Sequence, residues 1–302
     1  MISLSIIIVN WNTCELLKDC LASIRENLKS ASEIEVIVVD NASADGSALM
    51  VQNDFPEVTL IANADNVGFV QANNQAARIA RGRYLLLLNS DTKLLDGGAL
   101  DVVDYLDSNP GVGIVTGRML YEDRSFQSSY FRFPTIASGI IAHTFRRVFT
   151  FKQPFHRYFN YADLSPDETH EVDWACGAYL YLRRDVLDEG RVFNEALFMY
   201  YEDTLLCKRS WKLGLKVIYL PKAPIVHYHN KSAKQILAKA ALYSFQSSVI
   251  YYEYTYGKKA VSFYRFIVHS MWRVFGAVFS LIPGKKFQDK SVFFRYLVRE
   301  DR

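Results

Sequence analysis

The sequence predicts an α/β protein with a mostly parallel sheet, flanking helices and a C-terminal helical extension. Over about the first ninety residues, short β-branched runs alternate with segments of helical period, which is typical of strand–helix–strand units. The strand segments are continuously apolar, as expected for parallel strands covered on both faces. From residue 232 onward the pattern is helical and rich in Tyr, Phe and Arg.

Four strands and three helices are expected in this first part. The strands are the apolar runs at residues 4–9, 34–39, 58–61 and 84–88. The helices, where apolar residues recur at helical spacing, are residues 16–24, 47–55 and 67–80. Pro56 ends the second helix because proline cannot continue it, and Gly82 fits the C-terminal stop of the third.

The pattern is looser after residue 89. Further strands are expected at residues 112–115, 179–182 and 216–220, with helices at residues 101–106 and 204–213. Residues 121–172 mix aromatic, basic and turn-forming residues without a clear period. We therefore expect an α/β domain over residues 1–230 and a helical tail over residues 231–302.

Composition excludes several classes of protein. With 302 residues, 50% hydrophobic and 22% charged, the chain can bury a large core. A net charge of +3 is too weak to suggest a nucleic-acid partner. The four cysteines form no C-x-x-C pair, which argues against a zinc or redox site and favours reduced thiols in the cytoplasm. The N-terminus lacks the basic segment of a signal peptide.

Polar residues follow three of the predicted strands. The segments are Val9-Asn10-Trp11-Asn12, Asp40-Asn41 and Asn89-Ser90-Asp91. Asn and Asp also cap helices and form turns, but three such ends on one sheet edge favour a ligand site, because ligands of open parallel sheets bind there. The sequence has no glycine-rich phosphate loop, so a phosphate would need a metal. Asp91 is the expected carboxylate for Mg²⁺ or Mn²⁺.

An ordered set of segments carries a family resemblance. They are residues 7–12, 38–47, 66–69 with Asn73, 86–91, 174–178, 198–203 with Leu206, Cys207 and Arg209, 219–221, and His227 with Ser232. Together these segments resemble family 2 glycosyltransferases of the GT-A fold, most closely the bacterial rhamnosyltransferase-like branch. The resemblance extends over about 230 residues.

The resemblance implies a donor site at the strand ends. Asp40 would hydrogen-bond the pyrimidine base and Trp11 would lie near it. The other residues expected to contact the nucleotide are Val9, Asn10, Asn41, Asn66, Gly68, Asn89 and Ser90. Asp91 matches the last Asp of the family's D-x-D motif, in which Asn89 here replaces the first carboxylate.

His227 has two interpretations. It matches a family histidine that binds the metal in some relatives, and it also fits a buried strand-end histidine bonded to the backbone. His229 lies two residues away and would share its face of a strand, so it is the alternative ligand.

Glu202 and Asp203 are the expected catalytic pair. By resemblance Asp203 is the general base that deprotonates the acceptor hydroxyl, and Glu202 orients the acceptor or supports the loop. Asp203 also fits a helix cap before Thr204, a role compatible with catalysis. Trp174 and Gly177 match a segment that frames the acceptor pocket, although a lone Trp is also a common core residue.

The implied function is an inverting, metal-dependent glycosyltransferase. Its donor would be a nucleoside-diphosphate sugar, dTDP-L-rhamnose or a UDP-sugar. Its acceptor would be a polysaccharide or lipid-linked glycan at the inner face of the cytoplasmic membrane. A nucleotide-sugar-binding protein without turnover is the main alternative. A nucleotidyltransferase would need a glycine-rich basic loop, which the sequence lacks.

The tail is expected to bind an anionic membrane peripherally. Residues 231–302 carry 13 Lys and Arg against 4 Asp and Glu, whereas residues 1–230 carry 22 against 28. Within residues 263–282, Arg265, His269 and Arg273 share one helical face, which favours an interfacial helix over a spanning one. Trp272 would lie among the headgroups. Alternatively, the tail packs on the catalytic domain or on a second subunit, as a homodimer.

Overall fold

The computed structural model of the chain describes residues 2–28, 33–145, 158–228 and 237–301. The chain forms two compact units. The first comprises Met1–Arg132, Arg157–Glu195 and Glu202–His229, and the second comprises Phe133–His156, Ala196–Tyr201 and Asn230–Arg302. The expected domain boundary at residue 230 falls outside the described residues and stays a prediction.

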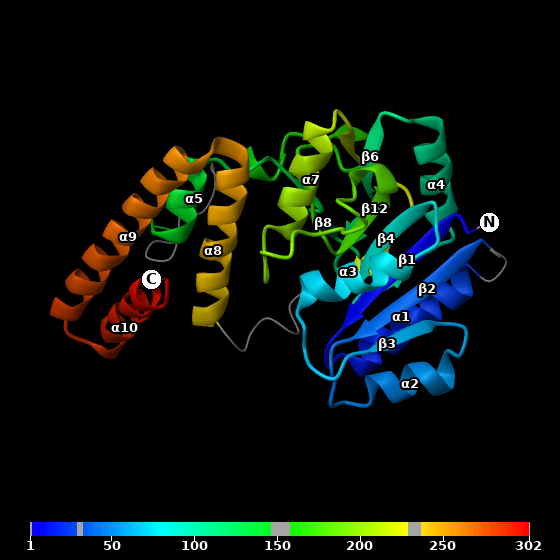
Figure 1. The fold of residues 1–302 in the computed structure, drawn as a ribbon, viewed down its shortest axis with the longest axis horizontal. Helices are drawn as coiled ribbons and strands as arrows, with labels where there is room; N and C mark the ends of the chain where they lie inside the picture. Colours follow the sequence, from blue (N-terminus) through cyan, green and yellow to red (C-terminus); the bar gives the residue numbers. More distant parts are fainter. Residues whose placement is uncertain (1, 29–32, 146–157, 229–236, 302) are drawn as a thin grey trace. The chain divides into compact units, whose positions relative to one another are not determined.

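The first unit contains an eight-stranded sheet whose first four strands are parallel (Figure 1). They are β1 (Leu4–Asn10), β2 (Ile34–Asp40), β3 (Thr59–Ala62) and β4 (Tyr84–Asn89). β1 lies between β2 and β4, and β3 pairs with β2. β1 and β4 are almost wholly buried, which explains their continuous Ile, Val and Leu side chains. The four predicted strands are confirmed.

Helices connect these strands as the periodicity predicts. They are α1 (Cys14–Asn27), α2 (Ser47–Asp54) and α3 (Phe69–Ile79). α1 buries Leu17, Cys20, Leu21 and Ile24, which recur at the spacing of one helical face. α2 ends two residues before Pro56, as expected from the loss of a backbone donor there.

In the other half of the sheet, one strand is antiparallel to both of its neighbours. It is the only such strand among the described residues. β12 (Tyr179–Arg183) is antiparallel to β4 and to β6 (Val112–Thr116). β13 (Lys216–Tyr219) is parallel to β6, and β10 (His170–Glu171) closes the edge. The helices of this half are α4 (Ala99–Ser108) and α7 (Glu202–Lys212). The sheet with its flanking helices confirms the predicted α/β class.

Short strands make two smaller sheets in the same unit. One has the order β5 (Thr92–Leu94), β14 (Ile225–His227), β7 (Met119–Leu120) and β8 (Phe126–Gln127). The other pairs β11 (Trp174–Ala175) with β9 (Tyr130–Phe131). The first of these sheets carries His227 to the end of β4, because His227 pairs with Thr92.

The second unit is helical, as predicted for the tail. Its helices are α5 (Ile136–His143), α8 (Leu237–Tyr256), α9 (Lys258–Leu281) and α10 (Lys285–Glu300). Phe245, Tyr252, Tyr264 and Trp272 form a buried aromatic core. Within the described parts of the chain, no helix has the length and apolarity needed to span a membrane.

The expected position of Trp272 is wrong. Its side chain is fully buried, and Nε1 donates a hydrogen bond to the His143 carbonyl 2.8 Å away. The indole lies inside the bundle because α5 supplies both an apolar contact surface and an acceptor for its N–H group.

Candidate active site

The polar ends of β1 and β2 are joined by hydrogen bonds. Asn10 lies opposite Asp40 in the sheet, and its Nδ2 donates to Asp40 Oδ1 at 2.9 Å. Asp40 Oδ2 accepts the Ser43 backbone N–H at 3.0 Å. Asp40 is therefore buried with both oxygens bonded, whereas Trp11 is 41% exposed. The carboxylate of Asp40 fixes the loop after β2, and its contact with a nucleotide base stays a prediction.

The end of β4 is tied into the same network. Thr13 Oγ1 donates to Asn10 Oδ1 at 2.6 Å and lies 2.9 Å from Ser90 Oγ.

Asn12 and Ala42, which follow β1 and β2, have φ values of 52° and 57°, a region that non-glycine residues seldom occupy. Such backbone conformations cluster at functional sites, where the surrounding structure enforces them.

The loop before α3 is held around Gly68. Asn66 Oδ1 accepts the Gly68 N–H at 2.9 Å, and Asn41 Nδ2 donates to the Gly68 carbonyl at 3.3 Å. Gly68 has a φ of 84°, which favours glycine, and α3 begins at the next residue. Asn41, Asn66 and Gly68 thus come together, and their contact with a nucleotide stays a prediction. Their hydrogen bonds hold the N-terminus of α3 next to the ends of the strands.

Asp91 and His227 face each other, with His227 Nε2 3.3 Å from Asp91 Oδ1. His227 is buried, and its Nδ1 lies 2.9 Å from Gln127 Oε1. With the amide in this orientation, Nδ1 donates to Gln127 Oε1, and Nε2 faces the Asp91 carboxylate. Imidazole and carboxylate are both ligands of Mn²⁺, and carboxylate is a ligand of Mg²⁺, so the residues fit the expected metal.

The protein supplies few ligands to this position. Across the described residues, no group of three or more His, Cys, Asp or Glu side chains is arranged to hold a metal ion. A catalytic Mg²⁺ usually takes one or two carboxylates and completes its shell with substrate phosphates and water. His229, the alternative ligand, lies outside the described residues.

Gln127 is a site residue that the sequence did not reveal. It comes from β8, which reaches His227 only through the pairing of β8 with β7 and of β7 with β14. Its Nε2 is buried and has no hydrogen-bond partner in the part of the chain that the structure describes. A two-residue strand in an aperiodic segment gives no sequence signal for such a contact.

Asp203 is held by backbone donors at the start of α7. Gly177 N–H donates to Asp203 Oδ2 at 3.0 Å, and Thr204 N–H donates to Oδ1 at 2.7 Å. Burial raises the pKa of Asp203 above its ordinary value, although these hydrogen bonds oppose the shift. The residues before the helix, Tyr200 and Tyr201, have φ values of 70° and 63°. The backbone that leads into the carboxylate is therefore in an unusual conformation.

Glu202 lies next to Asp203 in the first turn of α7. Burial and the neighbouring charge of Asp203 raise the pKa of Glu202 to about 8. Its Oε2 is buried and makes no hydrogen bond with any described residue. The pair thus combines one fixed carboxylate with one that is neutral at moderately acidic pH.

The segments that carry Asp203 and Asp91, the candidate base and the candidate metal ligand, are joined by a backbone hydrogen bond at one edge of the sheet. The Asn89 N–H donates to the Ala178 carbonyl at 3.0 Å, and Ala178 directly follows Gly177. Burial raises the pKa of the Cys176 thiol to about 12, and the charges of Asp203, Glu202 and Asp91 add to the shift.

Gly177 and Trp174 have different environments. A Cβ atom at Gly177 would lie 3.4 Å from Asp203 Cβ, an ordinary van der Waals contact, so Gly177 lies directly against the Asp203 side chain. Trp174 Nε1 donates to the Arg132 carbonyl at 2.9 Å, and its ring packs on Phe131 with centroids 4.6 Å apart. Trp174 is thus fixed by its neighbours in the small β9–β11 sheet. Its contact with an acceptor stays a prediction.

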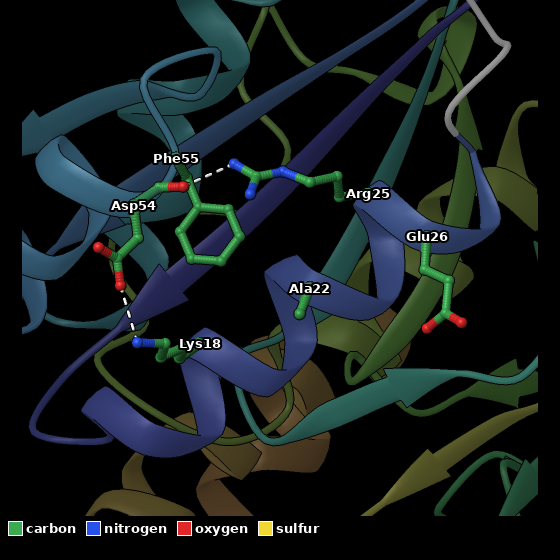
Figure 2. Close-up of a pocket in the computed structure, with 6 residues that line it drawn as sticks. All are labelled: Lys18, Ala22, Arg25, Glu26, Asp54 and Phe55. Carbon is green, nitrogen blue, oxygen red and sulfur yellow. Dashed lines mark hydrogen bonds and ion pairs between the residues drawn. The ribbon is translucent and has the colours of Figure 1, made fainter.

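A surface pocket lies between α1 and the end of α2 (Figure 2). It is lined by Lys18, Ala22, Arg25, Glu26, Asp54 and Phe55. Lys18 pairs with Asp54, and Arg25 pairs with Glu57 and covers the Phe55 ring. The pocket includes none of the candidate residues, and its two cations already have partners.

Comparisons with known proteins identify the family. The family model "Glycosyl transferase family 2" matches residues 5–189. The N-acetylglucosaminyl-diphospho-decaprenol L-rhamnosyltransferase of Mycobacterium tuberculosis (strain ATCC 25618 / H37Rv) is 25% identical over 236 residues, 74% of this chain and 76% of that protein. Rhamnosyltransferase WbbL of Escherichia coli (strain K12) is 24% identical over 248 residues, 78% of this chain and 88% of that protein.

A solved structure supports the fold. The mannosyltransferase PcManGT from Pyrobaculum calidifontis, in complex with GDP-Man and Mn²⁺, superposes with a TM-score of 0.53 at 17% sequence identity. The superposition covers 98% of this chain and 84% of that chain. This likeness confirms the predicted GT-A fold.

Proposed function

Because this chain belongs to glycosyl transferase family 2, we propose that it is an inverting glycosyltransferase that uses a nucleoside-diphosphate sugar. The observation that carries the proposal is the Asp203 carboxylate, which two backbone N–H groups hold beside the polar end of β4. A sugar hydroxyl is barely acidic, so its attack on an anomeric carbon needs a positioned base.

The proposed reaction is a single displacement. Asp203 takes the proton of the acceptor hydroxyl while that oxygen forms a bond to the anomeric carbon of the donor. The bond from that carbon to the diphosphate oxygen breaks, and the nucleoside diphosphate leaves with the bonding electrons. Attack opposite the leaving group inverts the anomeric centre. A raised pKa suits Asp203 to this step because it makes the carboxylate a stronger base.

Asp91 and His227 would hold Mg²⁺ or Mn²⁺ together with the donor diphosphate. When bound, the cation neutralises the charge that grows on the leaving diphosphate. Gln127 fixes the His227 ring so that Nε2 faces Asp91. The polar network of Asn10, Thr13 and Ser90 fixes the strand ends against which the donor would lie.

The relatives support a rhamnosyl donor and a lipid-linked acceptor. One is named for rhamnosyl transfer to an N-acetylglucosaminyl-diphospho-decaprenol, and another as a rhamnosyltransferase. We therefore favour dTDP-L-rhamnose, with a UDP-sugar as the second choice, and a lipid-linked glycan or growing polysaccharide as acceptor. Because such an acceptor would be met at the inner face of the cytoplasmic membrane, we propose that the protein associates with this face peripherally.

Product analysis tests the proposal. The purified chain is incubated with Mn²⁺, a lipid-linked acceptor extract and a panel of nucleotide sugars, and products are identified by mass spectrometry. The proposal expects a mass increase of one sugar with one donor, and NMR of the product should show the inverted anomer. Donor binding without any product would favour a nucleotide-sugar-binding protein of the same fold, and a retained anomer would exclude the single displacement.

A further inference from the structure

The longest helix of the second unit is apolar on two opposite faces. One face of α9 packs inside the bundle and includes Val261, Tyr264, Val268, Trp272 and Phe279. The opposite face, here called the α9 outer face, consists of Phe263, Phe266, Ile267, Val274, Val278 and Leu281. Five of these side chains are exposed: Phe263 at 58%, Phe266 at 67%, Val274 at 52%, Val278 at 45% and Leu281 at 84%.

The outer face is a stripe along the helix, interrupted on the same arc by Ser270. At about 100° per residue, its six members fall within an arc of about 120°. The stripe runs from residue 263 to residue 281, a length of about 27 Å at 1.5 Å per residue. A surface of this extent that is exposed in a soluble unit marks an interaction site.

We propose that the α9 outer face lies in the headgroup region of an anionic lipid surface, with the helix axis parallel to the membrane. Charge selects this partner. α9 contains no Asp or Glu; Lys258 and Lys259 begin it, and Lys285 and Lys286 follow its end. Arg273 is exposed between them. Each cation near an anionic surface is attracted to it, so both ends of the stripe favour the same partner.

The same charges disfavour a second copy of this chain. If two outer faces paired antiparallel, Lys258 and Lys259 of each copy would approach the other copy's Lys285 and Lys286. A parallel pair would bring identical lysines together. Like charges opposed across an interface suppress association, whereas phosphatidylglycerol headgroups would neutralise them.

Contacts inside the unit set the orientation of α9. Asp301 Oδ2 accepts from Arg265 Nη2 at 3.1 Å and lies 2.9 Å from His269 Nε2. Arg265 and His269 thus point toward the end of α10 and away from the outer face. The sequence predicted one cationic face of Arg265, His269 and Arg273. In the structure only Arg273 borders the apolar stripe, because the other two side chains contact Asp301. With its other face in the bundle, α9 can contact lipid only along its side.

The proposal rests on the proposed function for its purpose, since a lipid-linked acceptor would be met at such a surface. Vesicle binding is measured without turnover, so the two proposals can fail separately.

The test is flotation with vesicles of phosphatidylcholine alone and of phosphatidylcholine mixed with phosphatidylglycerol. The full chain is compared with the double variant Phe266→Ser/Leu281→Ser. We expect the wild type to float with the anionic vesicles, less so at high salt, and not with neutral ones. The double variant should bind at least about tenfold more weakly, because two exposed apolar side chains no longer enter the interface.

Leu49→Ser/Leu213→Ser is the matched control. These leucines are 61% and 54% exposed but belong to the first unit, so the control should float like the wild type. Thermal unfolding should be unchanged in both double variants, because all four positions are exposed. Wild-type protein that ignores anionic vesicles would overturn the proposal, as would equal binding by Phe266→Ser/Leu281→Ser. A wild-type dimer in light scattering that becomes monomeric in that variant would instead assign the face to a second copy.

Discussion

At the scale of single residues, the site depends on how each polar group is held. Asp203 accepts hydrogen bonds from Gly177 N–H and Thr204 N–H, which fix the carboxylate without neutralising it. Glu202, one residue earlier, has a buried oxygen that no described residue satisfies. Adjacent carboxylates therefore have different surroundings, and this difference suits one of them to remain charged as a base.

Asp203→Asn should abolish most transfer while leaving donor binding intact. The amide keeps the size of the side chain but cannot take a proton, so kcat should fall by roughly 10²–10⁴. The donor dissociation constant, measured by calorimetry with Mn²⁺, should change little because the proposed base acts on the acceptor and not on the donor. Asp101→Asn, an exposed position on α4, is the control and should leave kcat unchanged. Turnover within about tenfold of wild type would remove Asp203 from the base role.

Glu202 should make the protein less stable as pH rises. Its pKa is about 8 in the folded chain, against 4.5 ordinarily. Between these values the unfolded chain binds fewer protons than the folded chain, so the free energy of unfolding decreases with rising pH. Glu202→Gln should therefore be more stable than wild type at about pH 8, by about 1 kcal/mol or more, with the gap closing toward about pH 4.

Urea unfolding at several pH values measures this difference. The exposed Glu122→Gln variant serves as the control and should follow the wild-type pH dependence. A Glu202→Gln variant with the same pH dependence as wild type would show that the carboxyl ionises normally in the folded state.

Gln127→Leu should weaken metal binding without removing a ligand. The Gln127 carbonyl oxygen accepts from His227 Nδ1 and so orients Nε2 toward Asp91. Loss of such an outer partner typically lowers metal affinity about 10- to 100-fold. Electron paramagnetic resonance titration with Mn²⁺ measures it directly. Gln127→Glu keeps an acceptor at this position and should retain most of the affinity, whereas equal Mn²⁺ binding by the Leu variant would contradict the orienting role.

The sequence points to those candidate site residues that stand at or just after the ends of buried strands. Asn10, Asp40 and Asp91 stand out because polar residues are unusual directly after such runs. Gln127 and the bridging Thr13 do not stand out, because their roles depend on contacts made across the fold. Whether a predicted residue is exposed also depends on its neighbours. Asp40 is buried and accepts a hydrogen bond on each carboxylate oxygen, whereas the Trp11 side chain is exposed.

At the scale of elements, hydrophobic periodicity predicted the strands and helices whose formation does not depend on a distant partner. β1, β2, β4 and α1 to α3 follow from apolar runs and helical spacing. The strands β7 to β11 have two residues each, and a two-residue strand exists only through its partner. Trp272 shows the same limit in a helix, because helical spacing does not tell which apolar face a neighbouring helix covers.

Gly139→Ala should destabilise the second unit. α5 and α8 approach closely at Gly139, where a Cβ atom would overlap the Tyr252 ring and hydroxyl. Tyr252 is fully buried and its hydroxyl donates to the Thr135 carbonyl at 2.9 Å, so the ring has little room to move. Overpacking of this kind costs about 1–3 kcal/mol. Chemical unfolding measures the loss, and Gly111→Ala, where a Cβ meets nothing within 4 Å, should be close to neutral.

At the scale of the whole molecule, the candidate active site and the proposed lipid-binding face belong to different units. The candidate donor, metal and base residues all belong to the first unit, and the α9 outer face belongs to the second. The charge follows the same division, since the basic excess lies in residues 231–302. A ligand of the active site should therefore act on the stability of the first unit.

Saturating nucleotide-sugar donor with Mn²⁺ should raise the unfolding temperature of the first unit selectively. A ligand that binds only the folded state at about 100 times its dissociation constant adds about 2.7 kcal/mol. For a unit of this size that corresponds to about 5 °C or more. Differential scanning calorimetry of the full chain should show one transition that shifts with donor and another that does not. Excess EDTA should reduce the shift, because the diphosphate then lacks the cation that Asp91 and His227 would hold. Gly139→Ala should move the other transition and leave the donor shift intact. A donor-induced shift that is unchanged by EDTA would separate donor binding from the metal, and a shift confined to the transition sensitive to Gly139→Ala would place the donor outside the first unit.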